Sequence, residues 1–210
     1  DTLGQFSSGN YFTNDIDSPP NRVNITSVEY DTNQMTVFWN EYSPNLSRLI
    51  LKSKGQLEND FSSYQLLYSE TFEGDRTVIT TISSQNVTSY SIQEFDPTHE
   101  NWFWVRVTDY WGQINTGEGM THEIDPPPSR IDVLEVSYDL DNMTVTWSRT
   151  QDDDFGNYSV YRSDSESGER TFINVNDSPN DTMIVVSEFD PTHENWFWVE
   201  VEDFWGQQTL

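Results

Sequence analysis

A twelve-residue segment occurs twice in this chain without a single substitution, and it constrains the fold more than any other feature. It reads EFDPTHENWFWV at 94–105 and again at 188–199. Self-similarity of this kind is the signature of an internal structural repeat. Within the first copy Phe103, Val105 and Val107 occupy every second position, and a period of two predicts a β-strand. The Asp-Pro-Thr before it has turn chemistry, so each copy predicts a corner that leads into a central strand.

Shorter sequence matches outside this segment extend the repeat, and they predict two domains of about 100 residues each. The alternating trios that recur are Met35, Val37 and Trp39 in the first copy and Met143, Val145 and Trp147 in the second. Several short strands at this spacing, without helical periodicity, predict an all-β chain of two tandem β-sandwiches. We assign residues 21–125 to the first domain and 126–210 to the second, with Pro126–Pro128 as a stiff hinge.

The first 20 residues copy the segment that closes the first repeat. They align without gaps on Asp109–Pro128, with nine of 20 positions identical. Because the second repeat stops soon after Gln207, we expect it to lack its own last strand, and an incomplete sandwich exposes an edge that templates strand addition. Residues 1–20 would then act as a donor strand for another copy of the chain. The donor residues would be Tyr11, Phe12 and Ile16, the last two entering the acceptor core, and the acceptor residues Phe197, Val199 and Val201.

The connection at 41–62 is 14 residues longer than its counterpart in the second repeat. It holds three of the ten basic residues, Arg48, Lys52 and Lys54. We expect a surface elaboration of the first domain that contacts an acidic neighbour, and not a strand of the core.

The charge is strongly acidic, with 36 acidic against 10 basic residues and a net charge of −26. Such a chain repels phosphates and anionic membranes, which excludes nucleic acid as a partner. It has no apolar run near the ~18 residues that cross a bilayer, and no cysteine, so disulfides and thiolate metal sites are excluded. The simplest interpretation of the charge is a solvated surface.

Divalent-cation binding is the alternative interpretation of the acidic residues. Asp152, Asp153 and Asp154 form a run in one predicted turn, and they are weak calcium candidates. Calcium needs six to eight converging oxygens, and no run in the chain has EF-hand spacing. We therefore predict no required cofactor, with calcium as the alternative.

Catalytic motifs are absent from the sequence. There is no Gly-x-Ser-x-Gly, His-Glu-x-x-His or P-loop pattern. Two of the three histidines, His99 and His193, occupy the same place in the repeated corner, where bonding to the turn is a simpler role than catalysis. We predict that the protein is not an enzyme.

Asn-x-Ser/Thr sequons are about twice as frequent as chance would give. The alternative is that these residue types merely gather in turns. We favour N-glycans on several sequons, which places the protein outside the cytoplasm. The seven acceptor asparagines are Asn24, Asn45, Asn86, Asn142, Asn157, Asn176 and Asn180.

Two tryptophans per repeat should face away from the core if the alternating residues face inward. They would form an exposed aromatic patch that contacts a neighbouring subunit, a glycan or a sugar ligand. Cover by nearby loops and arginine stems is the alternative. The four residues are Trp102, Trp104, Trp196 and Trp198.

Several of these patterns together resemble the fibronectin type III family. The Pro-Pro opening, the strand of Met143, Val145 and Trp147, the corner with Phe189 and Pro191, and the DFWG after the central strand are similar to that family's motifs. Asn101 and Asn195 replace the corner tyrosine, which puts the usual tyrosine-corner hydrogen bond in doubt. The duplicated modules also resemble repeats of long prokaryotic cell-surface proteins. The resemblance implies a sandwich fold and no function by itself.

The sequence therefore favours a structural subunit of an extracellular, glycosylated filament, a head-to-tail homopolymer joined by donor strands. The first alternative is an adhesin module that binds carbohydrate or another surface as part of a longer repeat protein. A third interpretation is a window cut from such a protein.

Overall fold

The computed structural model describes residues 9–10, 12–13, 16–44, 50–51, 57–58 and 60–210. Within these residues all regular structure is β-strand, which confirms the predicted all-β class. The chain forms two compact units. Unit 1 comprises Asp1–Val28, Thr36–Ser91 and Asn101–Thr121, and unit 2 comprises Glu29–Met35, Ile92–Glu100 and His122–Leu210.

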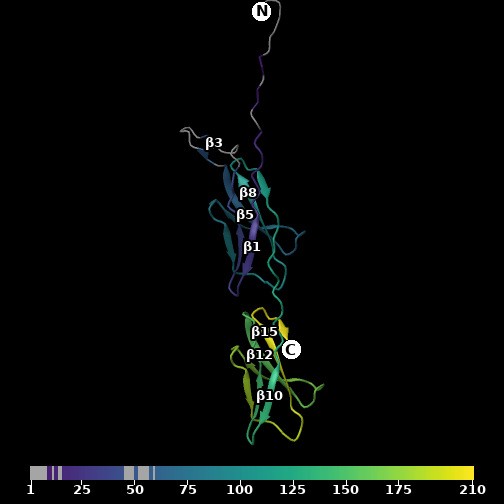
Figure 1. Cartoon of the computed structure of the whole chain (residues 1–210). Coiled ribbons are helices and arrows are strands. Elements are labelled where there is room, and N and C mark those ends of the chain that lie inside the picture. The colour runs from purple at the N-terminus through teal and green to yellow at the C-terminus, as the bar shows by residue number, and fades with distance from the viewer. Residues whose placement is uncertain (1–8, 11, 14–15, 45–49, 52–56, 59) are drawn as a thin grey trace, which may run out of the picture. The chain divides into compact units, whose positions relative to one another are not determined.

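The first sandwich has a three-stranded sheet of order β1-β2-β7 and a four-stranded sheet of order β6-β5-β8-β9 (Figure 1). This is the order of a fibronectin type III-like sandwich. Its strands are β1 (Ile25–Tyr30), β2 (Met35–Trp39), β5 (Phe61–Ser69), β6 (Thr77–Ile82), β7 (Ser89–Ile92), β8 (Trp102–Asp109) and β9 (Ile114–Thr116).

The second sandwich repeats this arrangement, with sheets of order β10-β11-β14 and β13-β12-β15-β16. Its core takes alternate residues from both sheets, including Val145 of β11 and Val160 of β12, which are fully buried. The predicted two-sandwich fold is therefore confirmed. The strands are β10 (Val133–Tyr138), β11 (Met143–Trp147), β12 (Phe155–Ser163), β13 (Thr171–Asn176), β14 (Met183–Val186), β15 (Trp196–Asp203) and β16 (Gln208–Thr209).

Two sequence predictions about strands need correction. The last strand of the second sandwich is not wholly missing, because β16 pairs Gln208 with Glu202 and Thr209 with Val201. The long connection is shorter than predicted, since β5 already begins at Phe61. Part of that connection forms a small antiparallel pair, β3 (Ile50–Leu51) with β4 (Leu57–Glu58).

Candidate functional site: the edge of the central strand

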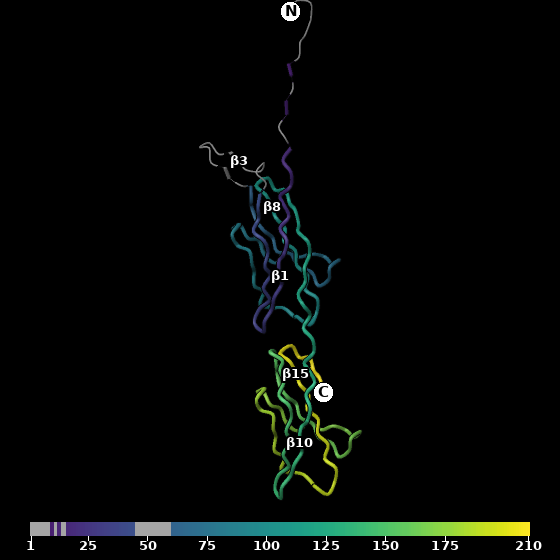
Figure 2. The backbone as a smooth tube through the Cα atoms, in the orientation of Figure 1, coloured from purple at the N-terminus to yellow at the C-terminus, as the bar shows by residue number. Residues whose placement is uncertain are grey.

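The central strand of the first sandwich, β8, is covered along its edge. After β9, the chain continues beside it: the Gly117 amide donates to the Val105 carbonyl at 2.9 Å, and Phe103 and Met120 exchange two backbone bonds of 2.9 and 3.0 Å. Figure 2 traces this stretch in teal along the first sandwich. We call residues 117–120 the closing segment.

Two glycines let the closing segment approach closely. A Cβ on Gly117 would overlap the Val23 carbonyl oxygen, and a Cβ on Gly119 would overlap the Trp104 indole. Glycine is required where a backbone lies this near to another group. The closing segment therefore covers both the part of the β8 edge that β9 does not pair with and a large aromatic side chain.

The corresponding strand of the second sandwich, β15, has a longer open edge. Its edge pairs with β16 only at Val201 and Glu202. Among the described residues, no segment pairs with Phe197 or Val199 on that edge. The side chains of these two residues point into the core, so the open edge borders the interior directly.

The predicted exposed tryptophan patch is wrong for Trp104, which is only 1% exposed. The closing segment covers it on one side, and the Arg76 guanidinium lies 4.0 Å from its ring centroid. Its neighbour Trp102 is half-buried, with the Phe72 ring 4.9 Å away. Cover by neighbouring groups, including an arginine, therefore describes Trp104 better than an exposed patch does.

The tryptophans of the second sandwich are less covered. Trp196 and Trp198 are half-buried and stack at 6.4 Å between ring centroids. Arg170 lies over Trp198 at 4.4 Å, as Arg76 does over Trp104. The element that differs is the closing segment, so Trp198 and the open edge belong to one incompletely covered surface.

The predicted donor residues lie partly within the described residues. Phe12 and Ile16 are each 93% exposed, and Tyr11 lies outside the described residues. In the aligned segment, Met120 is half-buried but Ile124 is 46% exposed. The counterpart of Ile16 thus is not a core residue, and Phe12 is the better candidate for insertion.

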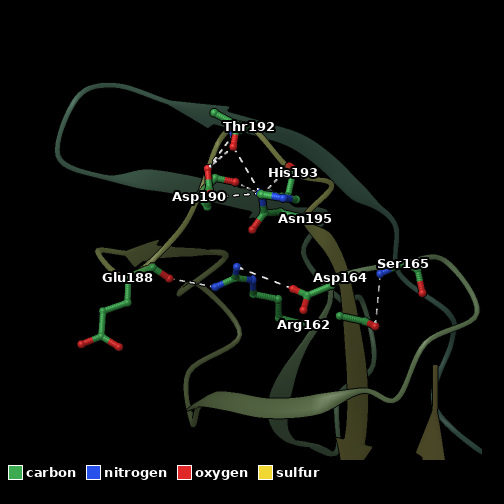
Figure 3. A network of polar contacts seen from close by, with 9 residues as sticks. Arg162, Asp164, Ser165, Glu188, Asp190, Thr192, His193 and Asn195 are labelled. Carbon is green, nitrogen blue, oxygen red and sulfur yellow. Dashed lines mark hydrogen bonds and ion pairs between the residues drawn. The ribbon is translucent and has the colours of Figure 1, made fainter.

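The repeated corner is a closed polar network, shown for the second copy in Figure 3. Asp190 accepts hydrogen bonds from the Thr192 amide at 2.9 Å and the Thr192 hydroxyl at 2.6 Å, and its other oxygen lies 2.9 Å from His193 Nδ1. The hydrogen bonds from Thr192, followed by that of His193, lower the pKa of Asp190 to about 2. His193 therefore contributes a hydrogen bond to the turn, as its place in the sequence predicts.

Asparagine substitutes for the corner tyrosine in the second copy. The Asn195 Nδ2 donates to the backbone oxygens of Asp190 and His193 at 2.9 and 3.0 Å. In the first copy Asn101 is buried, and its Oδ1 accepts from the Tyr68 hydroxyl at 3.3 Å. A side-chain bond to the backbone thus closes the second corner without a tyrosine.

The sequon asparagines differ in exposure. Asn24, Asn86 and Asn180 are exposed. The other described acceptors are half-buried, and the Nδ2 atoms of Asn157 and Asn176 already donate hydrogen bonds. The half-buried acceptors are Asn142, Asn157 and Asn176, and Asn45 lies outside the described residues.

The acidic run separates into different environments. Asp152 accepts from the Ser129 amide and the Thr150 hydroxyl, each at 2.8 Å, and Asp153 is exposed. Asp154 alone lies with other carboxylates, those of Asp125 and Asp203. The sequence singled out one of these three residues, because the other two come from distant segments.

No family model and no curated protein matches the chain. Solved structures do resemble it. The FN1–FN3 domains of chicken CNTN1 are 13% identical, with 90% of this chain and 64% of that one covered and a TM-score of 0.36. A two-domain fibronectin type III segment of chicken tenascin is 14% identical, with 89% and 95% covered and a TM-score of 0.39. The central fibronectin-III array of RIM-binding protein is 13% identical, with 88% and 63% covered and a TM-score of 0.35.

The chain spans just under two thirds of the CNTN1 and RIM-binding protein segments. At these identities and TM-scores the likenesses transfer no function. The fibronectin type III-like character of each sandwich follows from its own strand order.

Proposed function

We propose that this chain is the structural subunit of an extracellular, glycosylated filament that grows head to tail by strand complementation. Residues 9–17 of one copy would lie along the open edge of β15 in the next. The observation that supports this is the contrast between a closed edge at β8 and an open one at β15, in a chain that carries a second copy of the closing sequence.

The backbone geometry of the closing segment can be transferred to this contact. Gly9 aligns with Gly117, and Ile131 of the acceptor aligns with Val23. Both Val23 and Ile131 are buried, and Gly9 has open space around it in its own chain. The donor thus has a glycine at the first of the two positions where the first sandwich requires one.

The Phe12 side chain would contribute to the free energy of this contact. Moving this 93% exposed ring into the acceptor would stabilise the contact by roughly 1.5–3 kcal/mol. The donor carries Tyr11 where the first sandwich has Gly119, so the half-buried Trp198 ring must shift to admit it. The contact joins different surfaces and need not close into a ring, so it can propagate.

Glycans belong to this proposal because the exposed sequons offer acceptor sites. Asn24, Asn86 and Asn180 are the preferred acceptors. The intact mass of native material should then exceed the 24.5 kDa of the polypeptide, and an unmodified mass would remove glycosylation from the proposal. The described residues contain no helix long and apolar enough to cross a membrane.

A substitution that adds a single methyl group to the donor segment tests the contact. Gly9→Ala should fold like the native chain, because nothing lies within 4 Å of that position, yet it should block assembly by overlapping the acceptor backbone. Asn10→Ala is the matched control, since its counterpart Glu118 is exposed. Light scattering and electron microscopy of the full chain would measure assembly, and calorimetry would verify folding.

Equal polymerisation of Gly9→Ala and the native chain would contradict the donated strand. A native chain that stays monomeric at high concentration would favour the alternative, an adhesin module. In that case a carbohydrate should quench the fluorescence of Trp196 and Trp198, and Trp198→Ala should abolish that response.

A further inference from the structure

We propose that Asp125, Asp154 and Asp203 form a calcium site in unit 2. The three carboxylates place ligand oxygens within 4.8 Å of one another. Each comes from a different part of the chain: Asp203 ends β15, Asp154 precedes β12, and Asp125 precedes the proline run. A site of this kind is independent of the filament proposal, because it needs only one chain.

The backbone and neighbouring side chains hold these residues in place. The Phe204 amide donates to the Asp154 carbonyl at 2.6 Å. Gln207 Nε2 donates to both the carbonyl oxygen and Oδ2 of Asp125, at 3.2 and 3.0 Å. The Tyr30 hydroxyl donates to Asp125 Oδ1 at 2.9 Å. These contacts hold the Asp125 carboxylate and the Asp154 backbone in place.

Asp203 supplies an independent sign that the cluster binds a ligand. It is 2% exposed, and its Oδ1 accepts from the amides of Trp205 and Gln207 at 2.9 and 2.8 Å. Its Oδ2 is buried and has no hydrogen-bond partner within the described part of the chain. Burying a carboxylate oxygen in this way costs free energy unless a hydrogen bond or a cation compensates it. A cation bound among the three carboxylates would compensate it directly.

The local negative charge also favours the binding of a cation. Asp125 is only 8% exposed. In the described ranges, no basic side chain forms an ion pair with any of the three carboxylates. Asp154 lies beside the carboxylates of Asp125 and Asp203, so three negative charges repel one another there. A bound divalent ion would reverse this repulsion.

The same arrangement recurs in unit 1. Asp17, Asp60 and Asp109 also bring ligand oxygens within 4.8 Å of one another, and they align one for one with the three residues of unit 2. Gln113 Nε2 donates to Asp17 Oδ2 at 2.6 Å, as Gln207 does to Asp125. Because the two units are copies of one repeat, the recurrence shows that both copies keep the three acids together with the supporting glutamine.

The donor set favours calcium over other metals. All the side-chain ligands are hard carboxylate oxygens, without nitrogen or sulfur, which selects calcium or magnesium. Calcium accepts irregular geometry and mixed one- and two-oxygen carboxylate binding, whereas magnesium demands a near-ideal octahedron. Water can complete the coordination, because Asp154 is not fully buried.

The test uses the full chain after removal of divalent ions. Calorimetric titration with CaCl₂ should show saturable binding, and calcium should raise the unfolding temperature more than NaCl of equal ionic strength. MgCl₂ should do so less. Asp154→Asn should lose the unit 2 site and reduce the stoichiometry by one ion, whereas Asp153→Asn, an exposed neighbour with the same charge change, should bind as the native chain does.

A second measurement distinguishes a residue that binds calcium from one that only stabilises the fold. Without calcium, Asp154→Asn and Asp203→Asn should be at least as stable as the native chain, because each removes one of three crowded charges. With calcium, both should fail to gain the native increase in unfolding temperature at unit 2. The proposal is overturned if calcium acts no better than NaCl, or if Asp153→Asn and Asp154→Asn weaken binding equally.

Discussion

The two sandwiches share their interiors almost residue for residue and differ at one edge. Trp39 and Trp147 pack against Tyr64 and Tyr158 with ring centroids 5.9 and 5.7 Å apart. At the edge, however, Trp104 is fully covered while its counterpart Trp198 is half-buried. The comparison shows that the repeated strands build the core by themselves, whereas sealing it depends on a separate segment that follows the central strand.

The largest effect should come from removing the two edge tryptophans. Trp104→Ala leaves a cavity beneath the closing segment and should destabilise the first sandwich by about 3–5 kcal/mol. Trp198→Ala removes a ring that still meets solvent and should cost the isolated chain about half as much or less. Denaturant unfolding of the two full-length variants would measure the difference.

Assembly provides the control for this comparison. If a donated segment covers Trp198, then Trp198→Ala should weaken the filament far more than it weakens the single chain. Equal losses for both tryptophans in the single chain would show that the edge of the second sandwich is already sealed.

The sequence predicted the repeated interior well and the edges poorly. Alternation identified the strands that contain Val105 and Val199, because a half-buried strand imposes a period of two. The same rule placed Trp104 outside. It failed there because Gly119, which has no side chain of its own, covers the ring from the closing segment. Residues that approach without a side chain leave no signal in a hydrophobic pattern.

The acidic cluster could not be predicted from the sequence for a related reason. Asp154 stood out in a run of aspartates, but its partners Asp125 and Asp203 lie far from it in the sequence, and the three residues come together only in the fold. The strand β13 was also not predicted, since TFINVN mixes polar and apolar residues without a clear period. Clusters and edge strands of this kind depend on tertiary pairing, which the local sequence does not encode.

Two buried tyrosines should behave alike, in contrast to the tryptophans. The Tyr64 hydroxyl accepts from the Tyr42 amide at 2.7 Å and donates to the Gln85 carbonyl at 3.0 Å. The Tyr158 hydroxyl accepts from the Thr150 amide at 2.9 Å and donates to a carbonyl at 3.2 Å. Either Tyr→Phe change deprives a buried amide of its acceptor and should cost about 1–3 kcal/mol.

Denaturant unfolding of the two Tyr→Phe variants would check this equality. Matching losses would confirm that the sandwiches share one interior design. A loss confined to Tyr64→Phe would mean that the open edge already loosens the core of the second sandwich, and the contrast between the units would then extend beyond the edge.

The smallest effect concerns the corners, which recur in both copies of the repeat. Hydrogen bonds from Thr192 and His193 favour the ionised form of Asp190 and lower its pKa from 3.8 to about 2. The pKa of Asp96 in the first corner is lowered in the same way, chiefly by Thr98. Because the folded pKa lies below the unfolded one, the corner contributes full stability above pH 4 and loses it as the pH falls towards 2.

Asp190→Asn should therefore lower the unfolding temperature slightly at pH 6, and this difference from the native chain should shrink as the pH falls from 4 to 2. Scanning calorimetry across that range would measure it, with Glu188→Gln as the control, since Glu188 is an exposed residue with the same charge change. Asp96→Asn should give a similar dependence. If the gap for Asp190→Asn stays constant down to pH 2, the carboxylate charge does not stabilise the corner, and the turn is held by its asparagine and backbone bonds alone.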